Sequence, residues 1–254
     1  IANSTQGARL ESPVRKVIEG ILDFRRHVWP AYRRTFERLA DRQAPPVLFI
    51  TCSDSRVVPH LVTQSDPGDL FKVRTIGNLV PHSEGQHDAH SVPAALEFAV
   101  LVLGVSDIIL CGHSNCGAMK ALLSGDVPKE AKHLQGWLKF GDGALQRYCS
   151  APEVDHSLPD HDQLAEANIL EQLANLRSYS YIAEREAAGT LRLHGWFFDV
   201  GKAAIHAWEP ELAQFVEIDE EEGDRIIRHL EDAERQRTTT LTTVSHLVAA
   251  AAQK

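Results

Sequence analysis

Residues 47–56 read Val-Leu-Phe-Ile-Thr-Cys-Ser-Asp-Ser-Arg, an apolar and β-prone run that passes directly into a polar stretch. Pro45 and Pro46 bound the run on its amino side. A short apolar run between turn-forming residues is typical of a buried strand of the kind found in parallel sheets. We therefore predict a strand over Val47–Thr51, with a polar loop at its carboxyl end.

The segments downstream of this strand alternate between β-prone runs and helical patterns. The predicted strands are Leu70–Ile76, Ile108–Cys111, Leu191–Val200 and Ala203–Trp208, and the predicted helices are Ser91–Leu103, Cys116–Gly125 and Asp162–Ala188. The turn at Gly201-Lys202 predicts a hairpin between the last two strands. Strands that alternate with helices imply right-handed βαβ crossovers. The predicted fold class is therefore α/β, with a mainly parallel central β-sheet flanked by helices.

The N-terminal segment, residues 1–44, is predicted to be a basic, amphipathic helical arm. Ser12 is a favoured N-cap residue and Pro13 suits the first helical position. Apolar residues then recur at helical spacing until Pro30 interrupts them, and a second helical stretch follows. Two interpretations stay open: the arm packs on the core of its own chain, or it packs on a second subunit.

Two further segments do not follow the alternation of strand and helix. Residues 126–160 are rich in Gly, Pro, Asp and His, and we predict an irregular excursion there. The tail, residues 219–254, is acidic, then basic, then rich in Thr and Ala, and we predict a helical extension outside the core. No internal repeat is visible, so residues 1–254 are interpreted as a single domain with one active site.

Composition limits the class of protein. The chain has 254 residues, of which 43% are hydrophobic and 24% are charged, as in globular domains. Its net charge of −9 disfavours nucleic acid and anionic membranes as partners. The richest apolar stretch, Ala99–Leu110, is too short and too interrupted to span a membrane. We expect a cytoplasmic protein, although the chain does not begin with Met and an organelle-targeting segment could precede Ile1.

The four cysteines are too few for a disulfide scaffold, and two of them suggest a metal site. Cys52 ends the first strand, His113 follows the third, and Cys116 comes three residues later. The carboxyl ends of neighbouring parallel strands meet at one edge of a sheet, so these side chains can converge. Two thiolates and one imidazole suit zinc, and three protein ligands leave a fourth position for water. Taken singly, each residue is equally consistent with an ordinary core position.

Two charged residues beside Cys52 complete the predicted site. Asp54 can approach the metal or pair with Arg56. A carboxylate paired with Arg stays ionised and can accept a hydrogen bond from a metal-bound hydroxide. Without Arg56, Asp54 would compete for the fourth metal position and close the site. The remaining cysteines are interpreted as a core residue, Cys111, and a free thiol, Cys149.

Several motifs occur in the order and with the spacing of one known family. They are Cys-Ser-Asp-Ser-Arg-Val at 52–57, Pro-Gly-Asp-Leu-Phe at 67–71, Asn-Leu-Val-Pro at 78–81, Ala-Ala-Leu-Glu-Phe-Ala-Val at 94–100, Cys-Gly-His-Ser-Asn-Cys-Gly at 111–117 and Leu-His-Gly-Trp at 193–196. Through them the chain resembles the β-class carbonic anhydrases over roughly residues 15–218, its expected core.

The resemblance implies a zinc lyase that hydrates carbon dioxide reversibly to bicarbonate and a proton by means of a zinc-bound hydroxide. It implies one Zn²⁺ per chain, and a homodimer or higher even assembly with the pocket near the subunit interface. It also implies seven site residues in three groups. They are the zinc ligands Cys52, His113 and Cys116, the catalytic pair Asp54 and Arg56, and the substrate contacts Gln43 and Phe71.

A subset of the family binds bicarbonate at a second, inhibitory site built from a Trp, an Arg and a Tyr. Arg74 stands in the matching place here, but Phe49 and Phe198 replace the other two residues. Neither Phe can donate a hydrogen bond. The chain therefore resembles the subset whose site is constitutively open. Because two thiolates cancel the formal charge of zinc, we also expect greater activity at alkaline pH.

Other functions stay open at this point. A related enzyme could act on another small linear substrate such as carbon disulfide, and a zinc-stabilised scaffold could have lost catalysis. Asp54, Arg56 and Gln43 argue against the scaffold, since it needs none of them. A Cys-based phosphatase is excluded because its Arg follows the Cys by six positions rather than four. The candidate proton-shuttle residues are His60, His82, His87 and His90, each of which could equally be a solvated surface residue.

Overall fold

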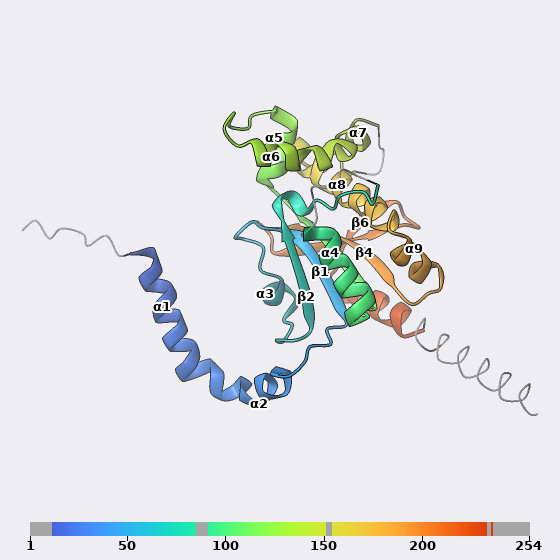
Figure 1. Ribbon diagram of the computed structural model, residues 1–254. Coiled ribbons are helices and arrows are strands. Elements are labelled where there is room, and N and C mark those ends of the chain that lie inside the picture. Colours follow the sequence, from blue (N-terminus) through green and yellow to red (C-terminus); the bar gives the residue numbers. More distant parts are fainter. Residues whose placement is uncertain (1–11, 85–90, 151–153, 233–234, 236–254) are drawn as a thin grey trace, which may run out of the picture. The chain divides into compact units, whose positions relative to one another are not determined.

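The computed structural model describes residues 12–84, 91–150, 154–232 and 235 of the chain (Figure 1). The chain divides into two compact units, Ile1–Gln43 and Ala44–Lys254. The larger unit holds the sheet and the predicted metal ligands, and the smaller one holds the N-terminal helices. Each is described by itself.

The larger unit is built on a six-stranded sheet with the order β2-β1-β3-β4-β5-β6. The strands are β1 Val47–Cys52, β2 Leu70–Thr75, β3 Asp107–His113, β4 Arg192–Asp199, β5 Ala204–Glu209 and β6 Gln214–Glu217. The first four are parallel to their neighbours, whereas β5 and β6 are antiparallel. The predicted α/β class, the mainly parallel sheet and the hairpin are thus confirmed, and β6 is an additional strand.

The register of the sheet brings the ends of three strands together. Cys52 is paired with Thr75, and one position earlier Thr51 is paired with Cys111. His113 ends β3 beside Phe198 of β4. The polar loops that follow β1 and β3 therefore lie side by side at the carboxyl edge of the sheet, where ligands bind in open α/β folds.

Helices cover one face of this sheet and form the main core with it. They include α4 Ser91–Glu97, which continues as the π-helical η3 Phe98–Leu103, and α8 Asp160–Arg177. Gly104 ends the first of these in the left-handed region, with φ 70°. A smaller cluster on the other side of the sheet includes Phe49, Ile109 and Phe198, against which α3 Pro59–Thr63 packs through Val62.

Residues 126–160 are not an irregular excursion, as their composition predicts. They contain α6 Lys132–Leu138, the 3₁₀ turn η4 Lys139–Gly141 and α7 Asp142–Ser150. The glycines that suggest turns serve close packing instead. A Cβ atom on Gly141 would lie 2.6 Å from Leu122, and one on Gly143 would lie 2.5 Å from Glu171. The helical pattern is hidden because helix α7 approaches its neighbours too closely for larger side chains.

The long helix predicted over 162–188 is in fact two helices. Helix α8 ends at Arg177, and α9 spans Ser180–Ala187 before Gly189 turns into the left-handed region. Tyr179 breaks the run with an extended backbone, φ −81° and ψ 115°. Its buried side chain donates a hydrogen bond to the Pro81 carbonyl at 2.8 Å. This tertiary contact overrides a local pattern that reads as continuous helix.

The N-terminal unit contains α1 Pro13–Asp23, the π-helical turn η1 Phe24–Val28 and α2 Trp29–Leu39. Two helical stretches are thus present as predicted, although Pro30 lies in the first turn of α2 rather than between the helices. The apolar residues of α1 lie along one face and are exposed. They are Val14, Val17, Ile18, Ile21 and Leu22, which expose between 48% and 62% of their surface.

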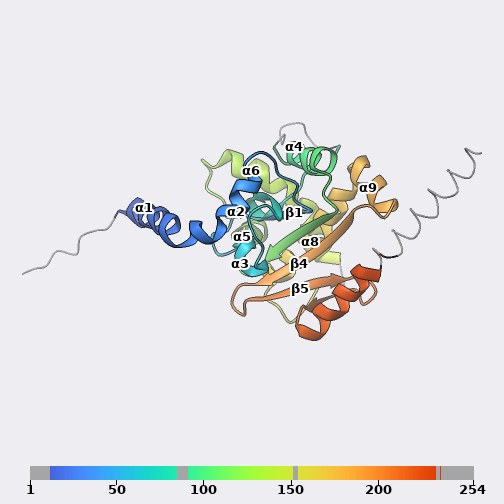
Figure 2. The same cartoon turned by 90° about the horizontal axis from the view of Figure 1, so that it is seen from below.

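The tail begins as a helix over residues 220–232, as predicted, and most of residues 233–254 lies outside the described residues. Figure 2 shows this helix beside β5. Arg225 of the helix pairs with Glu209 at the end of β5, with 3.0 Å between nitrogen and oxygen. Within the described ranges, no helix is both long enough and apolar enough to cross a membrane.

Candidate metal centre and catalytic pair

The three predicted zinc ligands converge at the carboxyl edge of the sheet. Cys52 is the last residue of β1, His113 is the last residue of β3, and Cys116 is the N-cap of α5 Gly117–Ser124. All three are buried, with at most 5% of their surface exposed. Their candidate ligand atoms lie within 4.8 Å of one another. Sixty residues separate the first of them from the others, so the parallel pairing of β1 and β3 creates the cluster.

The imidazole of His113 is held in the orientation that a metal ligand requires. Its Nδ1 is 2.9 Å from the Ser114 carbonyl, so Nδ1 carries the hydrogen and Nε2 keeps its lone pair. Nε2 is buried and has no hydrogen-bond partner among the described residues. A buried nitrogen without a partner is costly unless a cation occupies the space in front of it.

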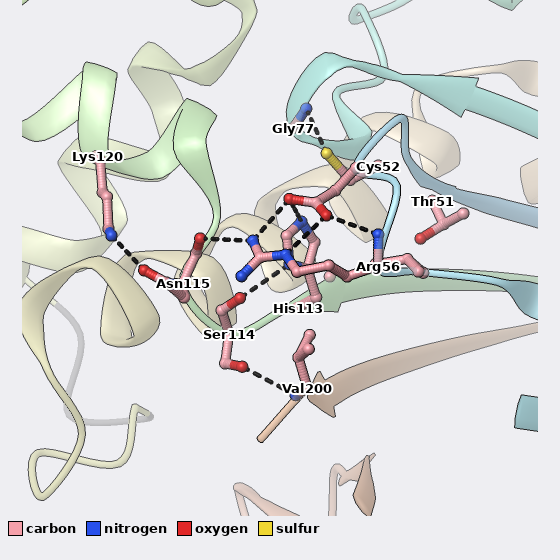
Figure 3. Close-up of polar contacts among 12 residues, drawn as sticks. Thr51, Cys52, Arg56, Gly77, His113, Ser114, Asn115, Lys120 and Val200 are labelled. Atoms are coloured by element: carbon pink, nitrogen blue, oxygen red, sulfur yellow. Dashed lines mark hydrogen bonds and ion pairs between the residues drawn. The ribbon is translucent and has the colours of Figure 1, made fainter. Parts of the chain in front are cut away.

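The two thiols share one negative charge in the absence of a cation. The hydrogen bond from the Cys116 thiol, helped by the Gly77 backbone N–H at 3.4 Å, lowers the pKa of Cys52 to about 4 (Figure 3). The Cys52 thiolate and burial together raise the pKa of Cys116. A divalent cation would favour ionisation of both sulfurs. The donor set, two sulfurs and one imidazole nitrogen, fits zinc.

Asp54 and Arg56 form a bidentate ion pair beside this cluster. Arg56 Nε donates to Asp54 Oδ1 at 2.9 Å, and Arg56 Nη2 donates to Oδ2 at 2.7 Å. The Arg56 backbone N–H adds a third hydrogen bond, to Oδ1 at 3.0 Å. Arg56 thereby holds the pKa of Asp54 well below its usual range. Asp54 Oδ2 lies 3.9 Å from His113 Nε2, so an ionised oxygen stands next to the metal-binding atoms.

Arg56 has a further contact that the sequence analysis missed. Its Nη2 donates to the backbone carbonyl of Asn115 at 3.1 Å (Figure 3). Asn115 has a left-handed backbone, φ 55°, and its N–H donates to Asp162 Oδ1 at 2.5 Å. The place of Asn115 between His113 and Cys116 could have drawn attention to it. No sequence pattern points to Asp162, because it lies 46 residues after the last zinc-ligand candidate in the middle of a different prediction.

Arg74 of β2 braces the loop that carries the catalytic pair. Its guanidinium donates to three backbone carbonyls: Cys52 at 3.1 Å, Asp54 at 2.7 Å and Val57 at 2.9 Å. The side chain is thus committed to the backbone of its own chain. This arrangement agrees with the expectation that it does not serve a second bicarbonate site here.

The two predicted substrate contacts are not brought to the cluster within the larger unit. Gln43 is exposed and is the last residue of the N-terminal unit. Phe71 pairs with Leu48, four positions along the ladder from Cys52, which corresponds to roughly 13 Å at about 3.3 Å per residue. Its ring instead packs against Phe98, with 5.8 Å between the ring centroids. The roles of Gln43 and Phe71 stay predictions.

The proton-shuttle candidates have local partners where they are described. His60 Nδ1 lies 2.9 Å from the Ser65 hydroxyl, and its Nε2 lies 2.5 Å from Lys72 Nζ. His82 Nδ1 accepts the Glu84 N–H at 3.2 Å. His87 and His90 lie outside the described residues. None of these contacts links a histidine to the metal cluster.

Comparison with known proteins gives one consistent answer. The carbonic anhydrase family model matches residues 47–205, which is more than half of the chain. The chain is 43% identical to a carbonic anhydrase of Pseudomonas aeruginosa over 207 residues, covering 82% of this chain and 93% of that one. The chain belongs to the carbonic anhydrase family. A carbonic anhydrase of Escherichia coli O157:H7 is 40% identical over 206 residues, covering 81% and 92% of the two chains.

Solved structures identify the class within the family. The β-carbonic anhydrase CcaA superposes with a TM-score of 0.75 at 36% identity, covering 81% of this chain and all of that one. A tetrameric β-carbonic anhydrase of Sordaria macrospora gives a TM-score of 0.65 at 30% identity, covering 76% and 95%. The resemblance to the β class is therefore confirmed. The chain is a zinc enzyme, a lyase that hydrates carbon dioxide reversibly to bicarbonate and a proton.

Proposed function

We propose that Cys52, His113 and Cys116 hold the catalytic zinc of this carbonic anhydrase. One observation carries the proposal: the lone pair of His113 Nε2 is buried without a hydrogen-bond partner among the described residues, and two thiol sulfurs lie within 4.8 Å of it. Three protein ligands leave a fourth tetrahedral position free. Bound zinc supplies the Lewis acidity that lets water lose a proton near neutral pH.

Asp54 is proposed as the residue that orients the nucleophile. Its carboxylate stays ionised beside Arg56, and its Oδ2 is 3.9 Å from His113 Nε2. It can therefore accept a hydrogen bond from the attacking hydroxide, whose free lone pair is then directed at carbon dioxide. Arg56 grips both carboxylate oxygens, which keeps Asp54 from turning into the fourth metal position. This is the open form of the site that the sequence predicts.

The substrate pocket is proposed to lie near the interface between two subunits. Gln43 would donate its amide hydrogen to a bicarbonate oxygen, and Phe71 would contribute an apolar wall. Phe71 lies on the edge strand β2, roughly 13 Å along the ladder from Cys52 at about 3.3 Å per residue, so it could reach the pocket of a second copy more readily than its own.

The assembly is proposed to be a homodimer or a higher even oligomer. The solved relatives from Sordaria macrospora are tetrameric. An apolar face of α1 and exposed apolar residues on η3, Leu101 at 59% and Val102 at 67%, are surfaces that a second copy could cover. We favour the interpretation in which the N-terminal arm packs on another subunit. The single domain with a core at about 15–218, and a cytoplasmic location, likewise stay proposals.

Substitution of Asp54 tests the proposed chemistry directly. Asp54→Asn keeps the size of the side chain but removes its charge, so kcat/KM should fall by roughly 10²–10⁴-fold while zinc content is unchanged. Stopped-flow hydration of carbon dioxide and metal analysis of the same sample measure both. Asp66→Asn, an exposed carboxylate in the loop before β2, is the matched control and should behave as wild type. Full activity of Asp54→Asn would refute the assigned role.

A further inference from the structure

A carboxylate on α8 supports the catalytic pair from outside the metal cluster. Asp162 lies in the first turn of α8 and exposes only 7% of its surface. Its Oδ1 accepts the backbone N–H of Asn115 at 2.5 Å, across 47 residues of sequence. The nearest titratable neighbour of this oxygen is His161, whose Nε2 lies 3.5 Å away. A buried carboxylate aimed at a backbone amide is typically retained because it fixes the direction of the loop that carries the amide.

The loop fixed by Asp162 is the one that orients Arg56. Asn115 adopts a left-handed backbone that residues other than Gly rarely adopt, so it needs contacts to hold it. Asp162 holds its N–H, and Lys120 of α5 holds its side-chain carbonyl. In this conformation the backbone carbonyl of Asn115 accepts Arg56 Nη2 at 3.1 Å. Figure 3 shows Asn115 between Lys120 and Arg56.

Arg56 depends on this contact because little else confines it. Its side chain is 40% exposed, and a long, exposed side chain loses conformational entropy when it is fixed. Its Nη2 is shared between Asp54 Oδ2 at 2.7 Å and the Asn115 carbonyl at 3.1 Å. The carbonyl therefore sets the direction in which the guanidinium grips the carboxylate.

We propose that Asp162 is a positioning residue that acts through Asn115 and Arg56 on the orientation of Asp54. The proposal rests on the roles assigned above to Asp54 and Arg56. Asp162 does not contact the three candidate zinc ligands in any hydrogen bond or ion pair of the described residues. Its loss should therefore leave zinc binding intact and reduce the catalytic step alone.

The test is a double-mutant cycle in the full-length, zinc-loaded enzyme. Asp162→Ala removes the acceptor, and kcat should fall about 10-fold with zinc content unchanged. Asp162→Asn retains an oxygen that can accept the Asn115 N–H, so it should stay within about 3-fold of wild type. Asp160→Ala removes an equal charge from the same turn of α8 at an exposed position, and it should change nothing. Asp162→Ser replaces Asp162→Ala if the latter does not fold.

The background of Asp54→Asn separates positioning from a general loss of structure. If Asp162 acts through Asp54, removing it from the Asp54→Asn enzyme should lower kcat less than about 2-fold further. Equal losses in both backgrounds, a loss of zinc in Asp162→Ala, or wild-type kcat in that variant would each overturn the proposal. A wild-type rate for Asp54→Asn alone would instead overturn the proposed role of Asp54, so the two failures are distinguishable.

Discussion

The reactive groups of this enzyme are each held in one state by a neighbour outside the metal cluster. The Ser114 carbonyl occupies Nδ1 of His113, which leaves Nε2 as the only nitrogen available for a metal. Arg56 keeps the pKa of Asp54 low, so this carboxylate stays ionised throughout the working pH range. A fall in activity toward acid pH should therefore come from the ionisation of water and not from Asp54.

Glu166 is the residue for which the structure predicts a pH-dependent stability. Burial raises its pKa to about 7, although its carboxylate accepts the Asp155 N–H at 2.8 Å. The pKa of an unfolded Glu is about 4.3, so between these values the folded protein binds more protons than the unfolded chain. Stability contributed by protonated Glu166 is then full at low pH and is lost as the pH rises through about 7.

Glu166→Gln keeps a hydrogen-bond acceptor without the charge. It should raise the free energy of unfolding at pH 8 by on the order of 1–3 kcal/mol and have little effect at pH 4. Thermal unfolding of both proteins at the two pH values measures the difference. Glu184→Gln, an exposed position on α9, serves as the control. A benefit that is equal at both pH values would show that the charge of Glu166 is not the cause.

At the scale of elements, α8 organises the site from behind the sheet. Near its start Asp162 binds the Asn115 loop, and farther along Asn168 donates to the Gly77 carbonyl at 3.0 Å. The N–H of the same Gly77 contacts the Cys52 sulfur at 3.4 Å. One helix thus positions both the loop of the catalytic pair and an amide that stabilises a candidate zinc thiolate.

Close packing of α8 on the sheet depends on glycine in β4. A Cβ atom on Gly195 would lie 2.8 Å from Ile169 Cγ2 and 3.0 Å from Leu173 Cδ1. Gly195→Ala should therefore reduce the free energy of unfolding by about 1–3 kcal/mol, since the helix must move away from the strand. Chemical denaturation tests this. Gly136→Ala in α6, where a Cβ would meet nothing within 4 Å, should be neutral or slightly stabilising. Equal effects of the two would contradict the packing argument.

The elements show which parts of the fold local sequence can predict. Strands β1 to β5 and the helix ended by Gly104 follow from apolar runs and terminal glycines, which are local signals. The break at Tyr179 does not, because it depends on a hydrogen bond to Pro81, 98 residues away. Helices α6 and α7 are also hidden, since Gly141 and Gly143 are selected by distant neighbours and look locally like turns.

The site divides in the same way. The three candidate zinc ligands, Asp54 and Arg56 stand in short motifs, so sequence alone nominates them. Asp162, Asn168 and Arg74 act through backbone atoms of distant loops, and a backbone contact leaves no signature in the residue that receives it. Such supporting residues become visible only when the elements are placed in space.

At the scale of the whole molecule, the exposed apolar face of α1 predicts a role in assembly. Val17→Asp combined with Ile21→Asp puts two charges on that face and should shift the protein to a smaller oligomer. Lys16→Asn combined with Gly20→Asp changes the net charge by the same two units away from that face. Light scattering coupled to size exclusion gives the masses. An unchanged mass for the first pair would exclude the arm from the subunit interface.

The central claim is that one zinc, held by Cys52, His113 and Cys116, carries the hydration of carbon dioxide. Stopped-flow hydration and metal analysis on the same samples of wild type and His113→Ala test it most directly. The wild type should contain about one zinc per chain and hydrate carbon dioxide, and both properties should be lost together in the variant. Full activity in a His113→Ala protein, or a full zinc complement in it, would contradict this account.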